Sequence, residues 1–543
     1  MAKRKREAHV QAEGQTKAID PQVVRHQKLH KVKSKESEGA GTGAATAAKE
    51  HATKSKATEG VEKVKVHTLD GETTTIQIVT GSYERVLHGF TATIPRTLVT
   101  QPEEEDPSKE KEQPNIAFSD TFLFNAHASA IRCLALSPYI DNPDGNGKVL
   151  LATGSTDERI NLYQISTRPP PLSNDKPKLP TLHGTSITEN RRNKELGSLL
   201  HHDSSVTCLF FPSRGKLMSA SEDSQIAITR TRDWVPLSTI KAPIPVPQGR
   251  PSGDTAAPGE VPSGINDFSV HPSMKLMVSV SKGEKCMRLW NLLTGKKAGV
   301  LTFSREILTA IGEGRFGTGE GRKVEWDTDG EEFAVSFERG VVVFGIDCIP
   351  TATIVPSPRT KIHQMRYLPN SSRILTLSTE DGRILFYDTK TPVSAPASTS
   401  TSKNDSVALP CAFIAQVGGP GAGIIGRVKD FEIIPYSSSS NGTTKFKYLI
   451  VAASSDGSVR LWSLDESELH AEPDDASSAA GNAGKSFTTK EVGKLVGTYS
   501  TGTRITCVKA FVMTGKPVEE EDGVETRNGK DEASGSSSEE DSD

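Results

Sequence analysis

The sequence predicts an all-β chain folded as a closed propeller of seven blades, and three observations support this prediction. Four stretches repeat one pattern, in which small residues and an Asp are followed by an alternating apolar strand. Seven short apolar segments can be aligned as the inner strands of successive sheets. Their spacing, once low-complexity inserts are subtracted, falls near the roughly 40 to 45 residues of one four-stranded blade.

The four repeats cover residues 154–163, 219–228, 378–387 and 454–462. Gly, Ser and Asp allow a tight turn, and the period-two alternation after the turn places one side of the next strand against a neighbour. A further copy at 279–291 keeps the strand and its Trp but has no Asp in the turn. These features are typical of Trp-Asp (WD40) repeats, in which each copy forms part of one four-stranded blade.

The aligned inner strands indicate seven blades and a particular way of closing the ring. The strands expected at 74–80, 85–94 and 121–125 precede the first inner strand, whereas the last inner strand has no later strands with which to pair. We therefore expect both ends of the folded region to share one blade, which removes the free edges of an open sheet. The seven predicted inner strands are 131–134, 206–209, 265–268, 323–326, 362–365, 428–431 and 505–508.

Long inserts explain why the raw spacing exceeds one blade. Cys133 and Cys208 are 75 positions apart, but the Pro-rich stretch 166–194 accounts for 29 of these residues. Glu325 and Gln364 are 39 positions apart with no insert between them. We predict mobile loops without assigned structure at 166–194, 243–263, 311–320, 389–410 and 465–490, and an acidic insert at 103–106.

The charge is balanced overall, with 65 Lys and Arg against 68 Asp and Glu, but it is segregated at the two ends. Residues 1–35 contain ten basic and three acidic residues, a net charge of +7, whereas residues 516–543 contain three basic and eleven acidic residues, a net charge of −8. Few aromatic residues occur in either end, so neither can bury enough surface to fold. The predicted domains are a disordered basic arm (1–70), the propeller (71–515) and a disordered acidic tail (516–543).

Several classes of protein are excluded by what the sequence lacks. No apolar run reaches the roughly 20 residues that span a bilayer, and no apolar segment follows the basic N-terminus as in a signal peptide. We therefore expect a soluble intracellular protein without membrane contact. The six Cys form no Cys-x-x-Cys pair, and Cys133, Cys208 and Cys507 occupy one equivalent strand position. They are interpreted as small core residues and not as disulfide or zinc ligands.

No motif predicts catalysis or a cofactor. The Gly patterns at 312–317 and 421–426 resemble a dinucleotide fingerprint, but each is followed by a predicted strand where that fingerprint requires a helix. No phosphate-binding Gly-Lys-Ser/Thr motif, His-Glu-x-x-His motif or Gly-x-Ser-x-Gly elbow occurs. We therefore predict a protein that is not an enzyme and that binds no cofactor and no metal.

The His and Asp residues of the repeats are expected to stabilise the blades. A His before an inner strand can bond to a strand Ser and to the turn Asp, and this predicts a brace between His127 or His202 and Asp157 or Asp223. The remaining residues assigned to turns or repeat strands are Asp381, Asp456, Trp290 and Trp462.

Two further groups are candidates for binding. Asp267, Glu325 and Asp430 share one inner-strand position, where they either give a channel mouth an acidic character suited to a basic partner or cap nearby backbone amides. The run Lys3, Arg4, Lys5 and Arg6 fits a nuclear import signal or an RNA contact, with a solvated charged end as the alternative.

Beyond the repeats, the segment 78–84, with the sequence Ile-Val-Thr-Gly-Ser-Tyr-Glu, resembles the opening strand of the WD-repeat p21-activated-kinase-interacting family. Fungal members of this family are called maintenance-of-killer ribosome biogenesis factors. The resemblance continues through 126–131, 154–160, 195–202, 217–223, 270–272 and 287–294. This sequence departs from the family pattern at Lys282-Gly283, at 423–426 and in the long inserts.

This resemblance implies a non-enzymatic scaffold that acts in the nucleus and nucleolus as an assembly factor for the large ribosomal subunit, during pre-rRNA processing. Its expected partners are ribosomal proteins and assembly factors of the pre-large subunit, and rRNA through the basic arm. The alternative that it implies is a signalling adaptor that negatively regulates a p21-activated kinase. We expect the protein to be a monomer.

Overall fold

The computed structural model describes a set of segments that all lie in the unit Thr58–Asp543. The predicted basic arm, apart from two residues, and the predicted acidic tail lie outside these residues, as do Lys3, Arg4, Lys5 and Arg6. The described segments are 67–68, 73–95, 116–139, 147–170, 190, 192–245, 262–313, 317–392, 408–424, 426–440, 443–470 and 490–514.

The described strands, apart from β1, form seven antiparallel four-stranded units, which we call blades 1 to 7. Blade 1 contains β5 (Ile131–Leu136), β6 (Lys148–Ser155), β7 (Ile160–Ser166) and β8 (Lys194–Leu199). Blade 2 contains β9 (Val206–Ser213), β10 (Lys216–Ser221), β11 (Gln225–Arg230) and β12 (Pro236–Lys241). Blade 3 contains β13 (Ile265–Val270), β14 (Leu276–Ser281), β15 (Cys286–Asn291) and β16 (Lys296–Thr302). Blade 4 contains β17 (Lys323–Trp326), β18 (Glu332–Ser336), β19 (Val341–Gly345) and β20 (Pro350–Ile354).

The last three blades complete the ring. Blade 5 contains β21 (Ile362–Tyr367), β22 (Ile374–Thr379), β23 (Arg383–Pro392) and β24 (Leu409–Gly418). Blade 6 contains β25 (Val428–Ser440), β26 (Thr443–Ser454), β27 (Ser458–Asp465) and β28 (Lys494–Ser500). Blade 7 contains β29 (Ile505–Val512), β2 (Thr73–Ser82), β3 (Val86–Pro95) and β4 (Ala117–Asn125). A short parallel pairing of β20 with β24 joins the outer edges of blades 4 and 5.

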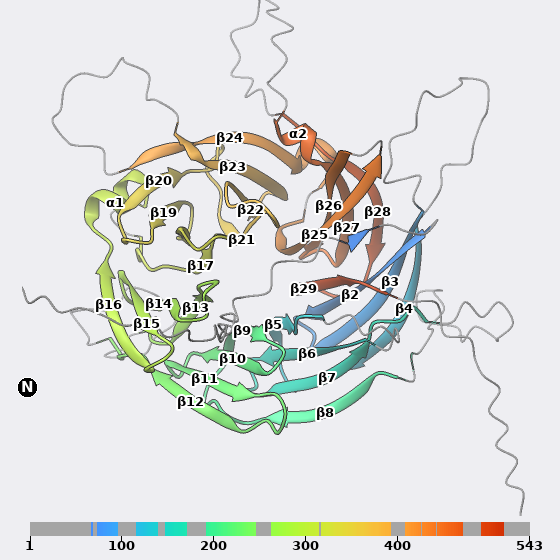
Figure 1. Ribbon diagram of the computed structural model, residues 1–543, viewed down its shortest axis with the longest axis horizontal. Helices are drawn as coiled ribbons and strands as arrows, with labels where there is room; N and C mark the ends of the chain where they lie inside the picture. Colours follow the sequence, from blue (N-terminus) through green and yellow to red (C-terminus); the bar gives the residue numbers. More distant parts are fainter. Residues whose placement is uncertain are drawn as a thin grey trace, which may run out of the picture. The chain divides into compact units, whose positions relative to one another are not determined.

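The hydrophobic core is divided among the spaces between blades. Seven clusters of buried residues occur in the described part of the chain, and each draws its members from two neighbouring blades. One cluster lies between each pair of neighbouring blades, from blades 1 and 2 to blades 6 and 7, and one cluster lies between blade 7 and blade 1. Figure 1 shows the corresponding ring, with β5, β9, β13, β17, β21, β25 and β29 nearest its centre. The predicted all-β propeller is confirmed.

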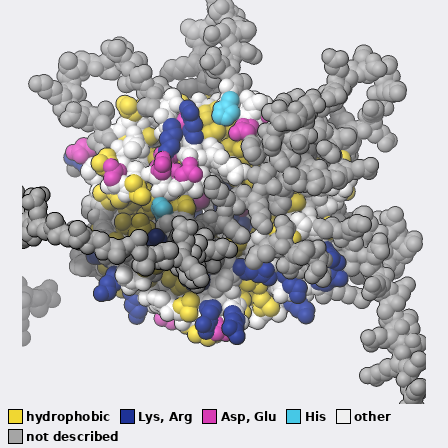
Figure 2. All heavy atoms as spheres, viewed as in Figure 1, with side chains coloured by type: hydrophobic (Ala, Val, Ile, Leu, Met, Phe, Trp, Pro, Cys, Tyr) yellow, Lys and Arg dark blue, Asp and Glu magenta, His cyan; other side chains and the backbone are white. Residues whose placement is uncertain are grey.

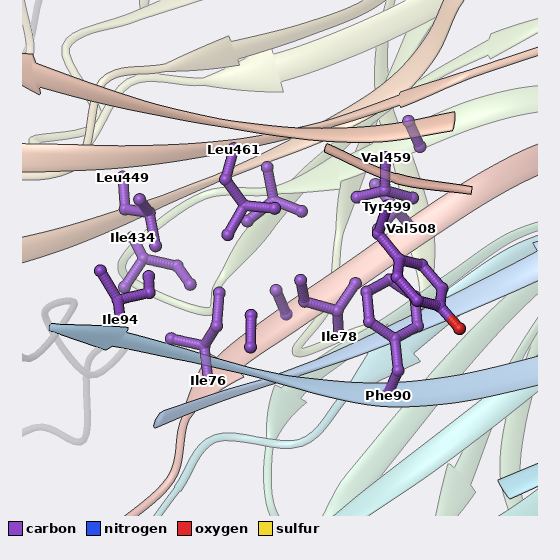
Figure 3. Packing of buried hydrophobic residues seen from close by; sticks show 14 of the residues in the cluster. Ile76, Ile78, Phe90, Ile94, Ile434, Leu449, Val459, Leu461, Tyr499 and Val508 are labelled. Carbon is purple, nitrogen blue, oxygen red and sulfur yellow. The ribbon is translucent and has the colours of Figure 1, made fainter. Parts of the chain in front are cut away.

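Blade 7 is the place where the ring closes. The inner strand β29 pairs antiparallel with β2 in a register that runs from Ile76 opposite Val512 to Ser82 opposite Ile505. This pairing, predicted from the lack of later strands, is present as expected. Figure 3 shows the packing that fixes it, in which Ile76, Ile78 and Phe90 of blade 7 lie against apolar side chains of blade 6.

The repeated turns share one backbone feature that the repeat pattern requires. The residue after the turn Asp has a positive φ in all four copies: 69° at Glu158, 63° at Ser224, 85° at Gly382 and 84° at Gly457. Gly adopts this left-handed conformation without the steric cost that a Cβ imposes, which explains why two copies have Gly there.

The structure departs from the predicted boundaries in a few places. Strand β1 (His67–Thr68) lies inside the predicted arm and pairs parallel with β25. Helix α2 (Glu466–His470) lies inside the insert 465–490, to which no structure was assigned, and its Leu469 is buried. Helix α1 (Arg305–Ala310) precedes the insert 311–320, and a 3₁₀ helix covers Pro420–Ala422. Neither described α-helix has the length and hydropathy that a membrane crossing needs.

Candidate functional site

The predicted brace is formed in blade 2. The ring of His202 lies between Ser219 on β10 and Asp223 in the next turn, with Nε2 2.8 Å from the Ser219 hydroxyl and Nδ1 3.0 Å from Asp223 Oδ2. The His202 side chain has no exposed surface, and that of Asp223 is 7% exposed. Asp223 also accepts a 2.8 Å bond from the amide of Gln225, which fixes the turn. The brace therefore ties the entry of one strand to the turn between two others.

Blade 1 has the same arrangement with a Thr in place of the Ser. His127 Nε2 lies 2.7 Å from the Thr153 hydroxyl, and Nδ1 lies 3.1 Å from Asp157 Oδ2. Burial lowers the pKa of His127, and this effect outweighs the nearby Asp157 carboxylate, which acts in the opposite direction. The ring is therefore neutral at pH 7, as a hydrogen-bonded structural His requires.

Three other blades replace the His with an Arg. Asp381 accepts a 2.8 Å bond from Arg383 Nε, and Asp456 lies 3.4 Å from Arg460 Nη2. Blade 3, which lacks the turn Asp, uses Glu284 instead, whose Oε1 accepts a 2.6 Å bond from Nη2 of Arg288. These pairs were not predicted, although each copy has an Arg two or four residues after the acid, on the strand that follows the turn.

The two Trp residues of the repeats are buried between blades. Trp290 is 4% exposed and its indole donates a 2.8 Å bond to the Ser279 hydroxyl on the neighbouring strand. Trp462 is 6% exposed and belongs to the cluster between blades 5 and 6.

A buried acidic residue in blade 4 was also not predicted. Glu332 is 5% exposed and accepts hydrogen bonds from three groups of blade 5. The Tyr367 hydroxyl lies at 3.1 Å, the Thr389 hydroxyl at 2.6 Å and the Lys390 ammonium at 2.8 Å. Glu332 therefore links blade 4 to blade 5 through a polar contact. A carboxylate on a short strand gave no signal of this role in the sequence.

A central channel with a volume of about 1210 Å³ runs between the inner strands. Asp267, Glu325 and Asp430 all line it. Asp267 accepts a 3.1 Å bond from the amide of Val324, and Asp430 accepts a 2.9 Å bond from the amide of Val508. Each Asp thus caps an amide on the inner strand of the next blade, which is the second of the two predicted alternatives.

The acidic groups of the channel face cations within it. Lys323 Nζ lies 3.8 Å from Asp267, and the guanidinium of Arg366 lies 3.7 Å from Asp430. Burial raises the pKa of Glu325 to about 7, despite the opposite effect of the nearby Arg366. The channel wall is therefore close to neutral, and a role of these three acids in binding a basic partner stays a prediction.

The channel also contains the aligned cysteines. Cys133, Cys208 and Cys507 line it as free thiols, and burial raises the pKa of Cys133 to about 12. A thiol with a raised pKa is a poor nucleophile and a poor metal ligand. In the part of the chain that the structure describes, no group of three His, Cys, Asp or Glu residues is placed to hold a metal ion.

One mouth of the channel is surrounded by ion pairs between blades, and we call it the brace-side mouth because the turns with the brace acids lie there. Glu222 of blade 2 accepts bonds of 2.8 Å from Arg132 and 2.7 Å from Lys282. These contacts tie three blades together at the rim. Exposed pairs of this kind contribute about 0 to 1 kcal/mol each, so they set the geometry of the rim more than its stability.

The two Gly patterns do not form a nucleotide site among the described residues. Helix α1 precedes the first pattern, whose residues 314–316 lie outside the described ranges, and the second pattern leads into strand β25. The helix N-terminus that a dinucleotide needs after its glycines does not follow either pattern.

Comparisons with known proteins agree with this architecture. A model of the family "WD domain, G-beta repeat" matches residues 193–228, which extend from β8 to β11. A chicken (Gallus gallus) protein named p21-activated protein kinase-interacting protein 1-like is 26% identical over 399 residues, covering 73% of this chain and 75% of that protein. Protein MAK11 of Saccharomyces cerevisiae is 25% identical over 421 residues, covering 73% of this chain and 80% of that protein.

The human p21-activated protein kinase-interacting protein 1 is 24% identical over 395 residues, covering 72% of this chain and 71% of that protein. The similarity therefore extends over most of the propeller in each case, well beyond the single matched repeat. The resemblance inferred from the sequence is confirmed: the chain is a homologue of the WD-repeat p21-activated-kinase-interacting proteins and of MAK11.

Proposed function

We propose that this WD-repeat propeller, a homologue of MAK11 and of the p21-activated-kinase-interacting proteins, is a non-enzymatic assembly factor for the large ribosomal subunit. It acts in the nucleolus, during pre-rRNA processing, as a scaffold that holds basic ribosomal proteins. The similarity to MAK11 over 73% of the chain supports this proposal most directly. The names of the relatives denote no enzyme, which favours a binding role over catalysis.

A surface on blade 4 has the chemistry that a basic protein partner requires. The loops at the end of the blade opposite to the brace-side mouth expose Asp329, Glu331 and Asp347. Between these acids lie two large apolar side chains, Ile346 and Ile349, which are 57% and 58% exposed. The two loops are joined by a 2.9 Å bond from the amide of Ile346 to the carbonyl of Glu331. Carboxylates around exposed isoleucines fit a segment that combines Lys or Arg with apolar residues.

Charge is unevenly distributed over the rest of the surface as well. Figure 2 shows one face of the molecule, on which Lys and Arg side chains lie along the lower border of the view and also beside the acidic side chains of its upper half. Basic and acidic side chains on one face allow a scaffold to contact partners of opposite charge. This supports a role among ribosomal proteins, which are basic, and RNA, which is acidic.

The test combines depletion with purification. Depletion of the protein should produce a selective shortage of large ribosomal subunits in a sucrose gradient, and the tagged protein should copurify with pre-large-subunit proteins. The variant with Asp329→Lys, Glu331→Lys and Asp347→Lys should lose these proteins, whereas Glu195→Lys on the exposed outer strand of blade 1 should retain them. Normal subunit ratios after depletion, together with a purification free of pre-ribosomal proteins, would contradict the proposal.

The names of the chicken and human relatives favour a second candidate, a signalling adaptor that negatively regulates a p21-activated kinase. A pull-down of the purified kinase, with and without its small GTPase, distinguishes the two candidates. The adaptor function predicts binding of the kinase and reduced kinase activity, with normal ribosomal subunits after depletion.

A further inference from the structure

A group of cations with few acidic partners lies at the brace-side mouth, between blades 5, 6 and 7. It consists of Lys361, Arg427, Lys429 and Arg504 together with the neutral imidazole of His363, and we call it the cationic cluster. Lys361, His363 and Lys429 line the central channel. Arg427 and Arg504 are exposed at the rim, and each immediately precedes the first residue of its inner strand.

The acids around the cationic cluster do not neutralise it. Glu338 is shared, since its carboxylate lies 3.5 Å from Lys361 Nζ and 3.8 Å from Arg322. Glu380 lies 3.2 Å from Arg427 Nε. Within the described residues, Lys429 forms no ion pair and no side-chain hydrogen bond. A half-buried ammonium without an acceptor is unusual, because burial of a charge is costly unless a partner compensates for it.

Arg504 also keeps its charge available. Its guanidinium carbon lies 5.6 Å from the centre of the Tyr83 ring, and its backbone amide, not its side chain, donates to Glu84. A cation placed over an aromatic ring is held in position without being neutralised. The Nε2 atom of His363 is buried and has no hydrogen-bond partner in the described part of the chain. The mouth therefore presents several unused donors.

The pKa values of two residues in the cationic cluster, His363 and Lys429, reflect this excess of positive charge. Burial, together with the positive charges of Lys429, Lys361, Arg427 and Arg322, lowers the pKa of His363 to about 3. Burial also lowers the pKa of Lys429, with Arg427, Arg504 and Lys361 contributing, while Glu380 opposes the change. Positive groups that depress one another's pKa values mark a place where an anion would be stabilised.

We propose that the cationic cluster binds a compact polyphosphate anion, of the inositol polyphosphate or inorganic polyphosphate class. Lys361, Lys429, Arg427 and Arg504 contact the phosphate oxygens. A compact ligand fits because the cations converge from three blades on a concave mouth. A single RNA strand also needs aromatic surfaces for base stacking, and Arg504 lies over one face of the Tyr83 ring beside the cluster. This inference does not depend on the function proposed above.

The test is calorimetric titration of the full chain with inositol hexakisphosphate and, separately, with tripolyphosphate, at constant pH and ionic strength. The double substitution Lys361→Gln and Lys429→Gln should weaken binding at least tenfold. The matched control, Lys216→Gln with Lys297→Gln, removes two exposed charges from blades 2 and 3 and should leave the affinity within twofold. Weak binding to the unmodified protein, or equal losses in the two double variants, would refute the site.

Two further measurements separate a loss of binding from a loss of folding and distinguish polyphosphate from RNA as the ligand. The single substitution Lys429→Gln removes an unpaired half-buried charge, so the variant should stay folded by circular dichroism and still bind polyphosphate about threefold or more weakly. Competition with a single-stranded oligoribonucleotide tests the alternative. If the oligonucleotide binds more tightly than either polyphosphate, and the Lys429 variant loses both equally, then the site recognises RNA and the proposal is wrong.

Discussion

The brace of blade 2 offers the sharpest test of how the repeats stabilise the ring. His202→Ala removes both of its side-chain contacts, at 2.8 Å to Ser219 and 3.0 Å to Asp223, and leaves these two buried groups without their partner. A hydrogen bond to a charged group contributes about 1.5 to 3 kcal/mol, and an unsatisfied buried group costs about 1 to 3 kcal/mol. We therefore expect His202→Ala to lower the free energy of unfolding by about 3 kcal/mol.

Asp223→Ala should have a similar effect, because Asp223 also accepts the amides of Gln225 and Asp203. The two residues bond to each other, so the losses of the single variants overlap. We expect the double variant to lose about 4 kcal/mol of stability, which is about 2 kcal/mol less than the sum of the single losses, and this difference is the coupling energy. Urea unfolding followed by Trp fluorescence and by circular dichroism measures all three variants. Additive losses, or single losses below about 0.5 kcal/mol, would refute the brace as a stabilising unit.

The pH dependence of stability provides a second test of the contact between His202 and Asp223. Burial alone would raise the pKa of Asp223, but the hydrogen bond from His202 and the backbone amides outweigh it and hold this pKa below its ordinary value. A depressed folded pKa contributes stability above the unfolded value of about 4, and this stability is lost as the pH falls through the folded pKa. The His202→Ala variant should therefore lose less stability than the unmodified protein between about pH 5 and pH 2.

Three further predictions concern the blade contacts and the channel. Glu332→Ala should lower the free energy of unfolding by about 3 kcal/mol because the buried hydroxyls of Tyr367 and Thr389 and the ammonium of Lys390 lose their acceptor, whereas the exposed neighbour Glu331→Ala should change it by less than about 0.5 kcal/mol in the same urea assay. Val508→Ala, in the cluster between blades 6 and 7, should lower the free energy of unfolding by about 2 to 3 kcal/mol. The control Val300→Ala, at a half-exposed position, should lower it by less than about 0.5 kcal/mol. Equal losses would show that the closing contact contributes no special stability. The pKa of His363 is lowered to about 3, so the folded state binds fewer protons than the unfolded state and stability falls as the pH decreases from about 6.5 towards 3. At pH 5 this loss is about 2 kcal/mol, and His363→Gln should abolish it in unfolding measurements at pH 7 and pH 5.

The sequence predicted the parts of the fold that local chemistry dictates. Three of the four turn Asp residues, Asp157, Asp223 and Asp456, accept a bond from the amide two residues later, and this local requirement leaves a readable pattern wherever it recurs. The closure of the ring by β29 and β2 also followed, because an unpaired edge strand is unfavourable and the number of strands left no other partner. These inferences needed only neighbours in the chain and a count of strands.

Contacts between blades were harder to predict because their partners are distant in sequence. Glu332 meets Lys390 across 58 positions, and neither residue lies in a pattern that identifies the other. The Arg residues that replace His in blades 3, 5 and 6 were overlooked for a different reason. The repeat pattern predicts a His before the inner strand, whereas Arg383 and its equivalents reach the turn acid from the strand that follows it.

The inner strands show why residues in the channel are poor guides to partner binding. Neighbouring inner strands belong to different sheets, so their facing backbone groups need side-chain partners. Thr207 donates a 2.7 Å bond to the carbonyl of Ile265, and Thr506 donates a 2.6 Å bond to the carbonyl of Ile131. Asp267 and Asp430 meet the same need from the acceptor side, at the amides of the next inner strand. A polar residue at this position is thus explained by the ring itself, and partners are better sought among groups that the ring leaves unused, such as the acids of the blade 4 loops and the unpaired ammonium of Lys429.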